Sequence, residues 1–63
     1  MTYAAAIAKD TITEFVSLQN AMAAAKRENA SETYGILKER YIILKATLMS
    51  IGVNLTEIDR IKE

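Results

Sequence analysis

The strongest constraint on the fold is a stripe of apolar residues in the second half of the chain. Its members are separated by 3, 4, 3, 4 and 3 positions, and they are Tyr34, Leu37, Tyr41, Leu44, Leu48 and Ile51. This spacing places all six on one face of an α-helix. It is typical of a helix that packs along its whole length against a parallel or antiparallel partner helix. We therefore expect an all-α fold.

Two long helices are expected to form an antiparallel hairpin. The first spans about residues 3–27, and the second spans about residues 30–51. Asn29 and Glu32 have the spacing of a capping box, which makes Asn29 the N-cap of the second helix, with Ser31 as the alternative. Because the connection is so short, the two helices must be antiparallel neighbours.

A short third helix is expected to complete a single domain that covers residues 1–63. Gly52 suits the left-handed position that follows the end of a helix. Asn54 and Glu57 then repeat the capping-box spacing, so a helix is predicted over about residues 55–62. It is too short to be stable alone, and must pack on the hairpin or on another chain.

The composition removes most enzymatic chemistry. The 63 residues include no Cys and no His, so disulfides, thiolate metal sites and Ser–His or Cys–His nucleophile pairs cannot form within one chain. No phosphate-binding loop is present either. We predict no catalytic residue, no metal site and no cofactor, and an enzyme is the least favoured class. The net charge of zero argues against DNA as a partner.

The apolar run at the start of the chain covers only residues 3–8, before Lys9 and Asp10. That is shorter than the apolar core of a signal peptide and far shorter than the ~20 residues of a membrane span. The interpretation is a cytoplasmic chain with no membrane association.

Self-association is predicted because the second helix carries apolar residues on three sides. A chain this small gains little free energy from its own core, and it has no staple to compensate. Two hairpins would pair most simply through two-fold symmetry into a four-helix bundle. The residues predicted at the interface are Phe15, Met22, Ile36, Ile42, Ile43, Thr47 and Met49.

A small anionic ligand is the second predicted partner. Arg40 lies between two apolar faces of the second helix, where it either pairs with a carboxylate such as Glu14 or receives a phosphate at a subunit seam. Tyr34 and Tyr41 are either core aromatics or stacking surfaces for a base. The candidate ligand residues are Tyr3, Tyr34, Lys38, Arg40, Tyr41 and Lys45.

Three functions remain open from the sequence. The first is a non-enzymatic interaction or regulatory protein that acts as a homo-oligomer, for example an adaptor or inhibitor. Such small helical chains are, as a general expectation, common products of phages and mobile elements. The second is a protein that binds or sequesters a nucleotide-like ligand between subunits. The third is an RNA-binding hairpin dimer, since the hairpin plan is similar, at the level of fold alone, to the RNA-binding hairpin that regulates plasmid copy number.

Overall fold

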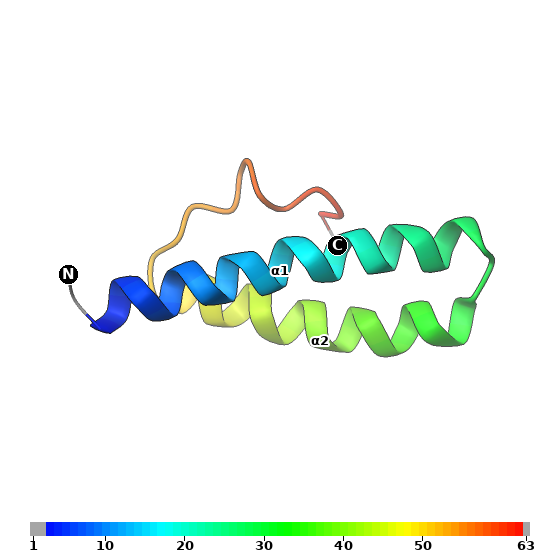
Figure 1. Ribbon diagram of the computed structural model, residues 1–63, viewed down its shortest axis with the longest axis horizontal. Coiled ribbons are helices and arrows are strands. Elements are labelled where there is room, and N and C mark those ends of the chain that lie inside the picture. Colours follow the sequence, from blue (N-terminus) through cyan, green and yellow to red (C-terminus); the bar gives the residue numbers. More distant parts are fainter. Residues whose placement is uncertain (1–2, 63) are drawn as a thin grey trace.

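The computed structural model describes the backbone of residues 3–62 and the side chains of residues 8–62, and shows a helical hairpin. Helix α1 covers Tyr3–Arg27 and helix α2 covers Ser31–Ser50. The two helices lie side by side along the long axis of the molecule, which measures 42 × 17 × 17 Å (Figure 1). The described residues form no strand, so the all-α hairpin predicted from the sequence is confirmed.

The turn between the helices uses Asn29 differently from the prediction. Asn29 adopts a left-handed backbone with φ of 58°. The N–H of Ala30 donates to the carbonyl of Ala25 at 2.9 Å, and that of Asn29 donates to Lys26 at 3.2 Å. This pair of bonds is a Schellman motif, so Asn29 ends α1. Ala30 stands at the N-cap of α2 and makes no side-chain bond there. The predicted capping box is therefore wrong, because Asn29 already serves as the left-handed residue that closes α1.

The end of α2 follows the sequence prediction. Gly52 has φ of 84°, a value that glycine adopts without steric cost. Its N–H donates to Met49 at 3.1 Å, and the N–H of Val53 donates to Leu48 at 3.0 Å. These bonds form a second Schellman motif, and Val53 packs against the core beside it. The chain turns back over the hairpin from this point.

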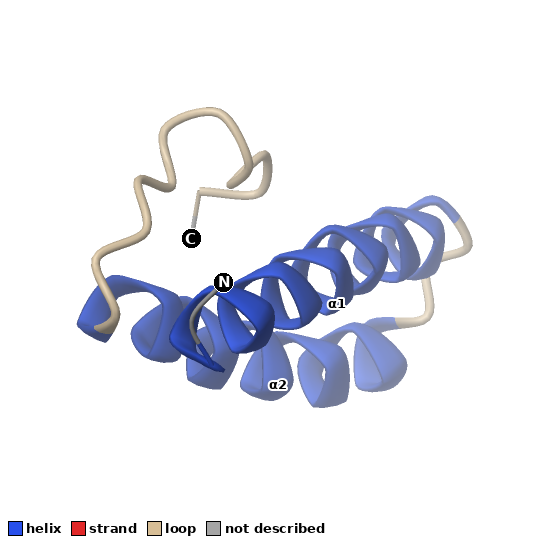
Figure 2. Cartoon of the chain, turned by 60° about the vertical axis from the view of Figure 1, so that its left-hand side comes forward, coloured by secondary structure: helices blue, strands red, loops and turns tan. Residues whose placement is uncertain are grey.

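Residues 53–62 do not form the predicted third helix. They run as a coil back over the hairpin, and we call this segment the C-terminal strap (Figures 1 and 2). The side chain of Asn54 does accept the N–H of Thr56 at 2.9 Å, as a helix cap would. One further bond, from the N–H of Asp59 to Leu55 at 2.9 Å, closes a single turn. The helix stops there because the following N–H groups bind side chains instead, as described below.

The core lies between the two helices and under the strap. Its fully buried members include Phe15, Met22, Tyr41 and Leu48. The rings of Phe15 and Tyr41 are stacked, with centroids 5.3 Å apart and planes 14° from parallel. The partly buried apolar residues that pack against this core include four from the strap: Val53, Leu55, Ile58 and Ile61. The strap thus covers the open side of the hairpin, where a third helix was expected.

Two predicted interface residues belong to this core. Phe15 and Met22, predicted at the interface, are fully buried inside one chain and expose no surface there to a second chain. The arc of apolar residues on α1 is broad because it contacts both α2 and the strap. The apolar stripe on α2 is buried at Tyr41, Leu44 and Leu48, whereas Ile51, just past the end of the helix, is exposed.

Candidate functional site

A cluster of four polar side chains joins α1, α2 and the strap at the centre of the molecule. It consists of Gln19 from α1, Tyr41 and Lys45 from α2, and Asp59 from the strap, and we call it the polar cluster. Gln19 is 3% exposed and Asp59 is 6% exposed, which makes them the buried polar residues of the described chain. Buried groups of this kind must be hydrogen-bonded to be tolerated.

Gln19 fastens the strap through its amide group. The Nε2 atom donates to the carbonyl of Ile58 at 2.6 Å. The Oε1 atom accepts the N–H groups of Arg60 at 2.6 Å and Ile61 at 3.0 Å. One side chain therefore replaces three backbone bonds that a longer helix would otherwise make. This replacement explains why the strap remains a coil beyond its single turn.

Asp59 makes the second attachment. Its Oδ1 atom accepts the hydroxyl of Tyr41 at 2.6 Å and the backbone N–H of Lys62 at 2.9 Å. Its Oδ2 atom lies 2.9 Å from Nζ of Lys45. The Lys45 ammonium also lies 5.6 Å from the centre of the Tyr41 ring, within range of a cation–π contact. The carboxylate is thus bonded to α2 and to its own segment at the same time.

The cluster shifts the pKa values of its charged members in opposite directions. Burial alone would raise the pKa of the Asp59 carboxyl, but bonds from Tyr41, Lys45 and the Lys62 N–H together lower it below its usual value. The bond to Asp59 raises the pKa of Lys45 above its usual value, against a smaller opposing effect of burial. Both groups are therefore held in their charged forms near neutral pH.

The polar cluster has the character of a structural attachment. Among the described residues, no buried side-chain nitrogen or oxygen lacks a hydrogen-bond partner. The acceptor atoms of Gln19 and Asp59 are directed at the strap and at α2. The arrangement can hold a chain segment in place, and its strength depends on the ionisation of one carboxylate.

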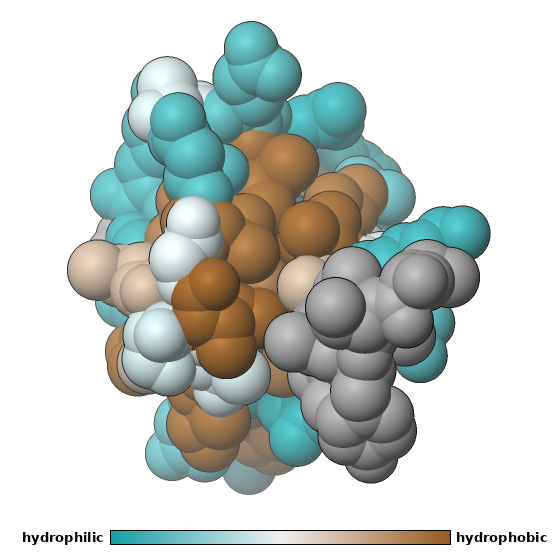
Figure 3. All heavy atoms as spheres, turned by 90° about the vertical axis from the view of Figure 1, so that its left-hand side faces the viewer, coloured by the Kyte–Doolittle hydropathy of each residue, from teal (hydrophilic) through white to brown (hydrophobic). Residues whose placement is uncertain are grey.

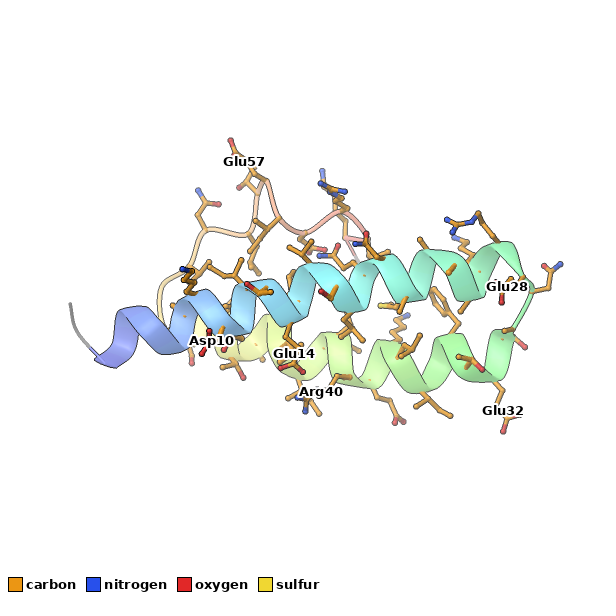
Figure 4. All side chains as sticks on the ribbon, in the orientation of Figure 1. Asp10, Glu14, Glu28, Glu32, Arg40 and Glu57 are labelled. Carbon is orange, nitrogen blue, oxygen red and sulfur yellow. The ribbon has the colours of Figure 1, made fainter. Side chains whose placement is uncertain are left out.

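The residues predicted to bind a ligand do not come together in one place. Tyr41 and Lys45 belong to the polar cluster. Arg40 instead points toward Glu14 of α1, with its Nε atom 3.0 Å from the carboxylate (Figure 4). This is the carboxylate pair that the sequence left open as an alternative. Both side chains are about half exposed, so the pair contributes roughly 0–1 kcal/mol to stability.

The remaining predicted ligand residues lie elsewhere. Tyr34 is half-buried near the hairpin turn, and Lys38 is half-buried one turn further along α2. The side chain of Tyr3 lies outside the described residues. The fold alone does not test whether these residues bind a ligand, so their role stays a prediction.

Sequence reasoning missed Gln19 and Asp59. The signal for Gln19 was present: it lies four positions after Phe15 and three before Met22, so it shares their buried face. A polar residue on that face must bind something inside the molecule. No comparable signal marks Asp59, because its partners on α2 are 14 to 18 positions away in the chain, at Lys45 and Tyr41.

The outward side of α2 carries a second feature, a group of exposed apolar side chains. We call Ile36, Ile42, Ile43 and Met49 the outer face of α2, in which Ile36 and Ile43 lie roughly 100° around the helix axis from Ile42 and Met49. Each of these four side chains is between 52% and 63% exposed. Thr47, predicted beside them, is also exposed and donates its hydroxyl to the carbonyl of Ile43. Large apolar residues gathered on one helix typically mark a binding surface.

Comparisons with known proteins give no match to this chain, whether with protein-family models, curated proteins or solved structures. Within the described residues, neither α1 nor α2 has an apolar stretch long enough to cross a membrane.

Proposed function

We propose that this chain is a non-enzymatic interaction protein that works as a homodimer, with the outer face of α2 as the surface where two copies meet. The observation that carries the proposal is the exposure of Ile36, Ile42, Ile43 and Met49, none of which the strap or α1 covers. Covering such side chains is favourable by roughly 25 cal/mol for each Å² of apolar surface removed from water.

A second copy of α2 fits the side of this face that carries Ile42 and Met49, in an antiparallel arrangement. Gly35, Ile42 and Met49 follow one another at intervals of seven residues, with Ile42 in the middle. Gly35 is exposed, and a side chain at its position would meet no atom within 4 Å. In an antiparallel pair centred on Ile42, the long Met49 side chain of one copy lies against the bare backbone of the partner's Gly35. A large residue opposite a small one allows two helices to approach closely.

Charge also favours the antiparallel arrangement. Glu39 lies among the residues of the outer face and is exposed. In a parallel pair, the two Glu39 side chains would stand at the same level and repel each other. In the antiparallel pair centred on Ile42, they are separated by six residues along the axis, or about 9 Å at the helical rise of 1.5 Å per residue.

Apolar surface also reaches the end of the hairpin next to this face. Viewed from the end where α1 begins and α2 finishes, apolar residues occupy the middle and part of the lower edge, and hydrophilic residues gather mainly along the top (Figure 3). Ile51, close to that end, is a large exposed apolar residue as well.

The proposal predicts that a charge in the middle of the outer face separates the dimer. The unchanged protein is expected to sediment at twice its 7.0 kDa monomer mass. An Ile42→Glu variant is expected to raise the dimer dissociation constant at least ~100-fold, which corresponds to about 2.7 kcal/mol. Because Ile42 is exposed in the single chain, the variant should keep its helical circular dichroism.

The matched control is Ala21→Glu, which adds the same charge at an exposed position of α1. This variant is expected to remain dimeric. A monomeric unchanged protein at concentrations near 100 µM, or an Ile42→Glu variant that dimerises as well as Ala21→Glu, would contradict the proposal.

A further inference from the structure

A basic hollow lies where the end of α1, the start of α2 and the end of the strap meet. It is lined by Ala23, Lys26, Arg27, Tyr34, Arg60 and Ile61. Three of these six residues are cations, and none is acidic. We call this site the basic hollow. The chain as a whole carries equal numbers of acidic and basic residues, so this concentration of positive charge is a local feature of the hollow.

The strap completes the hollow, because Arg60 comes from its end. The backbone N–H of Arg60 is held by Oε1 of Gln19, and that of Ile61 by the same atom. The exposed Arg60 side chain is thereby brought beside Lys26 and Arg27, more than thirty positions earlier in the sequence. The same buried amide that fixes the strap therefore also assembles this group of cations.

The three cations of the hollow have no carboxylate partner among the described residues, although Lys26 and Arg27 also lie in the last turn of α1, where positive charge is favourable. The last carbonyls of α1, those of Ala24, Ala25 and Lys26, already accept backbone N–H groups in the turn. The cations Arg40 and Lys45 pair with Glu14 and Asp59, respectively. Within the described residues, no carboxylate forms an ion pair with Lys26, Arg27 or Arg60. Three like charges around one hollow repel one another, and an anion bound among them would relieve that repulsion.

Tyr34 adds a surface for a ring next to these charges. It lines the basic hollow and also an adjoining one, which is bounded by the hairpin turn at Asn29 and Ala30. Lys26 is shared by both hollows as well. A ligand with a phosphate among the cations thus has room for a flat group against the tyrosine. Bases of any kind can stack on an aromatic side chain, because each base has a flat π face.

We propose that the basic hollow binds a small phosphate-bearing molecule, with a nucleoside phosphate as the class that uses both the cations and Tyr34. Arg27 and Arg60 supply planar guanidinium groups suited to phosphate oxygens, and Lys26 supplies a point charge. The hollow is built within one chain from the inward side of α2, whereas the proposed dimer uses its outer face. The two proposals can therefore fail independently.

The test is calorimetric titration with ADP, inorganic phosphate and adenosine, supported by amide chemical shifts. ADP is expected to bind more tightly than phosphate, adenosine is expected not to bind, and the affinity should fall as salt is added. Shifts should centre on Lys26, Arg27, Tyr34 and Arg60. An Arg60→Gln variant is expected to weaken ADP binding at least ~10-fold, because it removes one charge-assisted contact while keeping the backbone bond to Gln19.

The matched control is Lys9→Gln, which removes one charge from an exposed position outside the hollow. Because Lys9 lies outside the hollow and its charge is screened by salt, this variant should change the ADP affinity by less than ~2-fold. Absence of ADP and phosphate binding at millimolar concentration would overturn the proposal, as would equal losses in Arg60→Gln and Lys9→Gln. Equal affinity for phosphate and ADP would overturn the assignment of a nucleoside phosphate. Binding by the Ile42→Glu variant is expected to match that of the unchanged protein.

Discussion

Replacing Gln19 with leucine is expected to lower the free energy of unfolding by about 3 kcal/mol. The leucine fills a similar volume but makes none of the three hydrogen bonds to Ile58, Arg60 and Ile61. Each buried backbone group left without a partner costs about 1–3 kcal/mol, reduced where the strap moves out to reach water. A domain of this size has only about 3–9 kcal/mol of total stability, so the loss is large.

Urea denaturation measures the loss of overall stability, and amide hydrogen exchange shows which backbone N–H groups lose their protection. The amides of Arg60 and Ile61 should lose their protection more than those in the middle of α1 and α2. Asn20→Leu is the matched control, because Asn20 carries the same amide at the next, exposed position of α1. If Gln19→Leu and Asn20→Leu unfold at the same urea concentration, the Gln19 side chain does not hold the strap.

Replacing Asp59 with alanine is expected to destabilise the fold by about 2–4 kcal/mol. The change leaves the buried hydroxyl of Tyr41 without its acceptor and removes the bond from the N–H of Lys62. It also removes the ion pair with Lys45. Thermal unfolding should show a clear fall in Tm, whereas Glu57→Ala, which removes an exposed carboxylate from the same strap, should leave Tm nearly unchanged.

The same carboxylate predicts how stability depends on pH. Because the pKa of Asp59 is lower in the folded protein than in the unfolded chain, folding favours its charged form. This stabilisation is complete above the unfolded pKa of about 3.9 and is lost as the pH falls through the lower folded value. The unchanged protein should therefore lose stability below pH 4 more steeply than Asp59→Ala. Parallel acid profiles for the two proteins would contradict the role assigned to Asp59.

Local sequence patterns were sufficient to predict the two long helices. The 3, 4 spacing of the α2 stripe and the helix-ending glycine at position 52 each depend on neighbours within a few positions. The observed bounds, Tyr3–Arg27 and Ser31–Ser50, agree with the predicted ones to within one residue. The Asn29 capping box failed for a local reason, because asparagine is suited both to starting a helix and to the left-handed residue that ends one.

The third helix failed for a non-local reason. Its predicted start at Asn54 makes the expected cap, and its apolar residues do pack on the hairpin. What the pattern could not reveal is that Gln19, about forty positions away, accepts the N–H groups that would have extended the helix. A side chain far away in the sequence that binds the backbone N–H groups of a segment leaves no periodic pattern in the sequence of that segment.

The candidate site was only partly predictable for the same reason. Exposure of Ile36, Ile42, Ile43 and Met49 followed from their places outside the α2 stripe, and the structure leaves all four uncovered. Tyr41 and Lys45 were predicted only as ligand residues, a role that stays a prediction, and their shared partner, Asp59, depends on the path of the strap. The basic hollow depends on that path too, since Arg60 reaches Lys26 and Arg27 only because the strap folds back.

The most direct test of the proposed dimer is disulfide formation in an Ile42→Cys variant. The chain contains no cysteine, so any link formed must join the introduced residues of two copies. In an antiparallel pair centred on position 42, the two sulfurs lie together, and gentle oxidation should yield mostly covalent dimer at micromolar concentration. An Ala21→Cys variant should remain largely unlinked under the same conditions. Equal, slow linking in the two variants would show that the outer face of α2 does not meet a second copy.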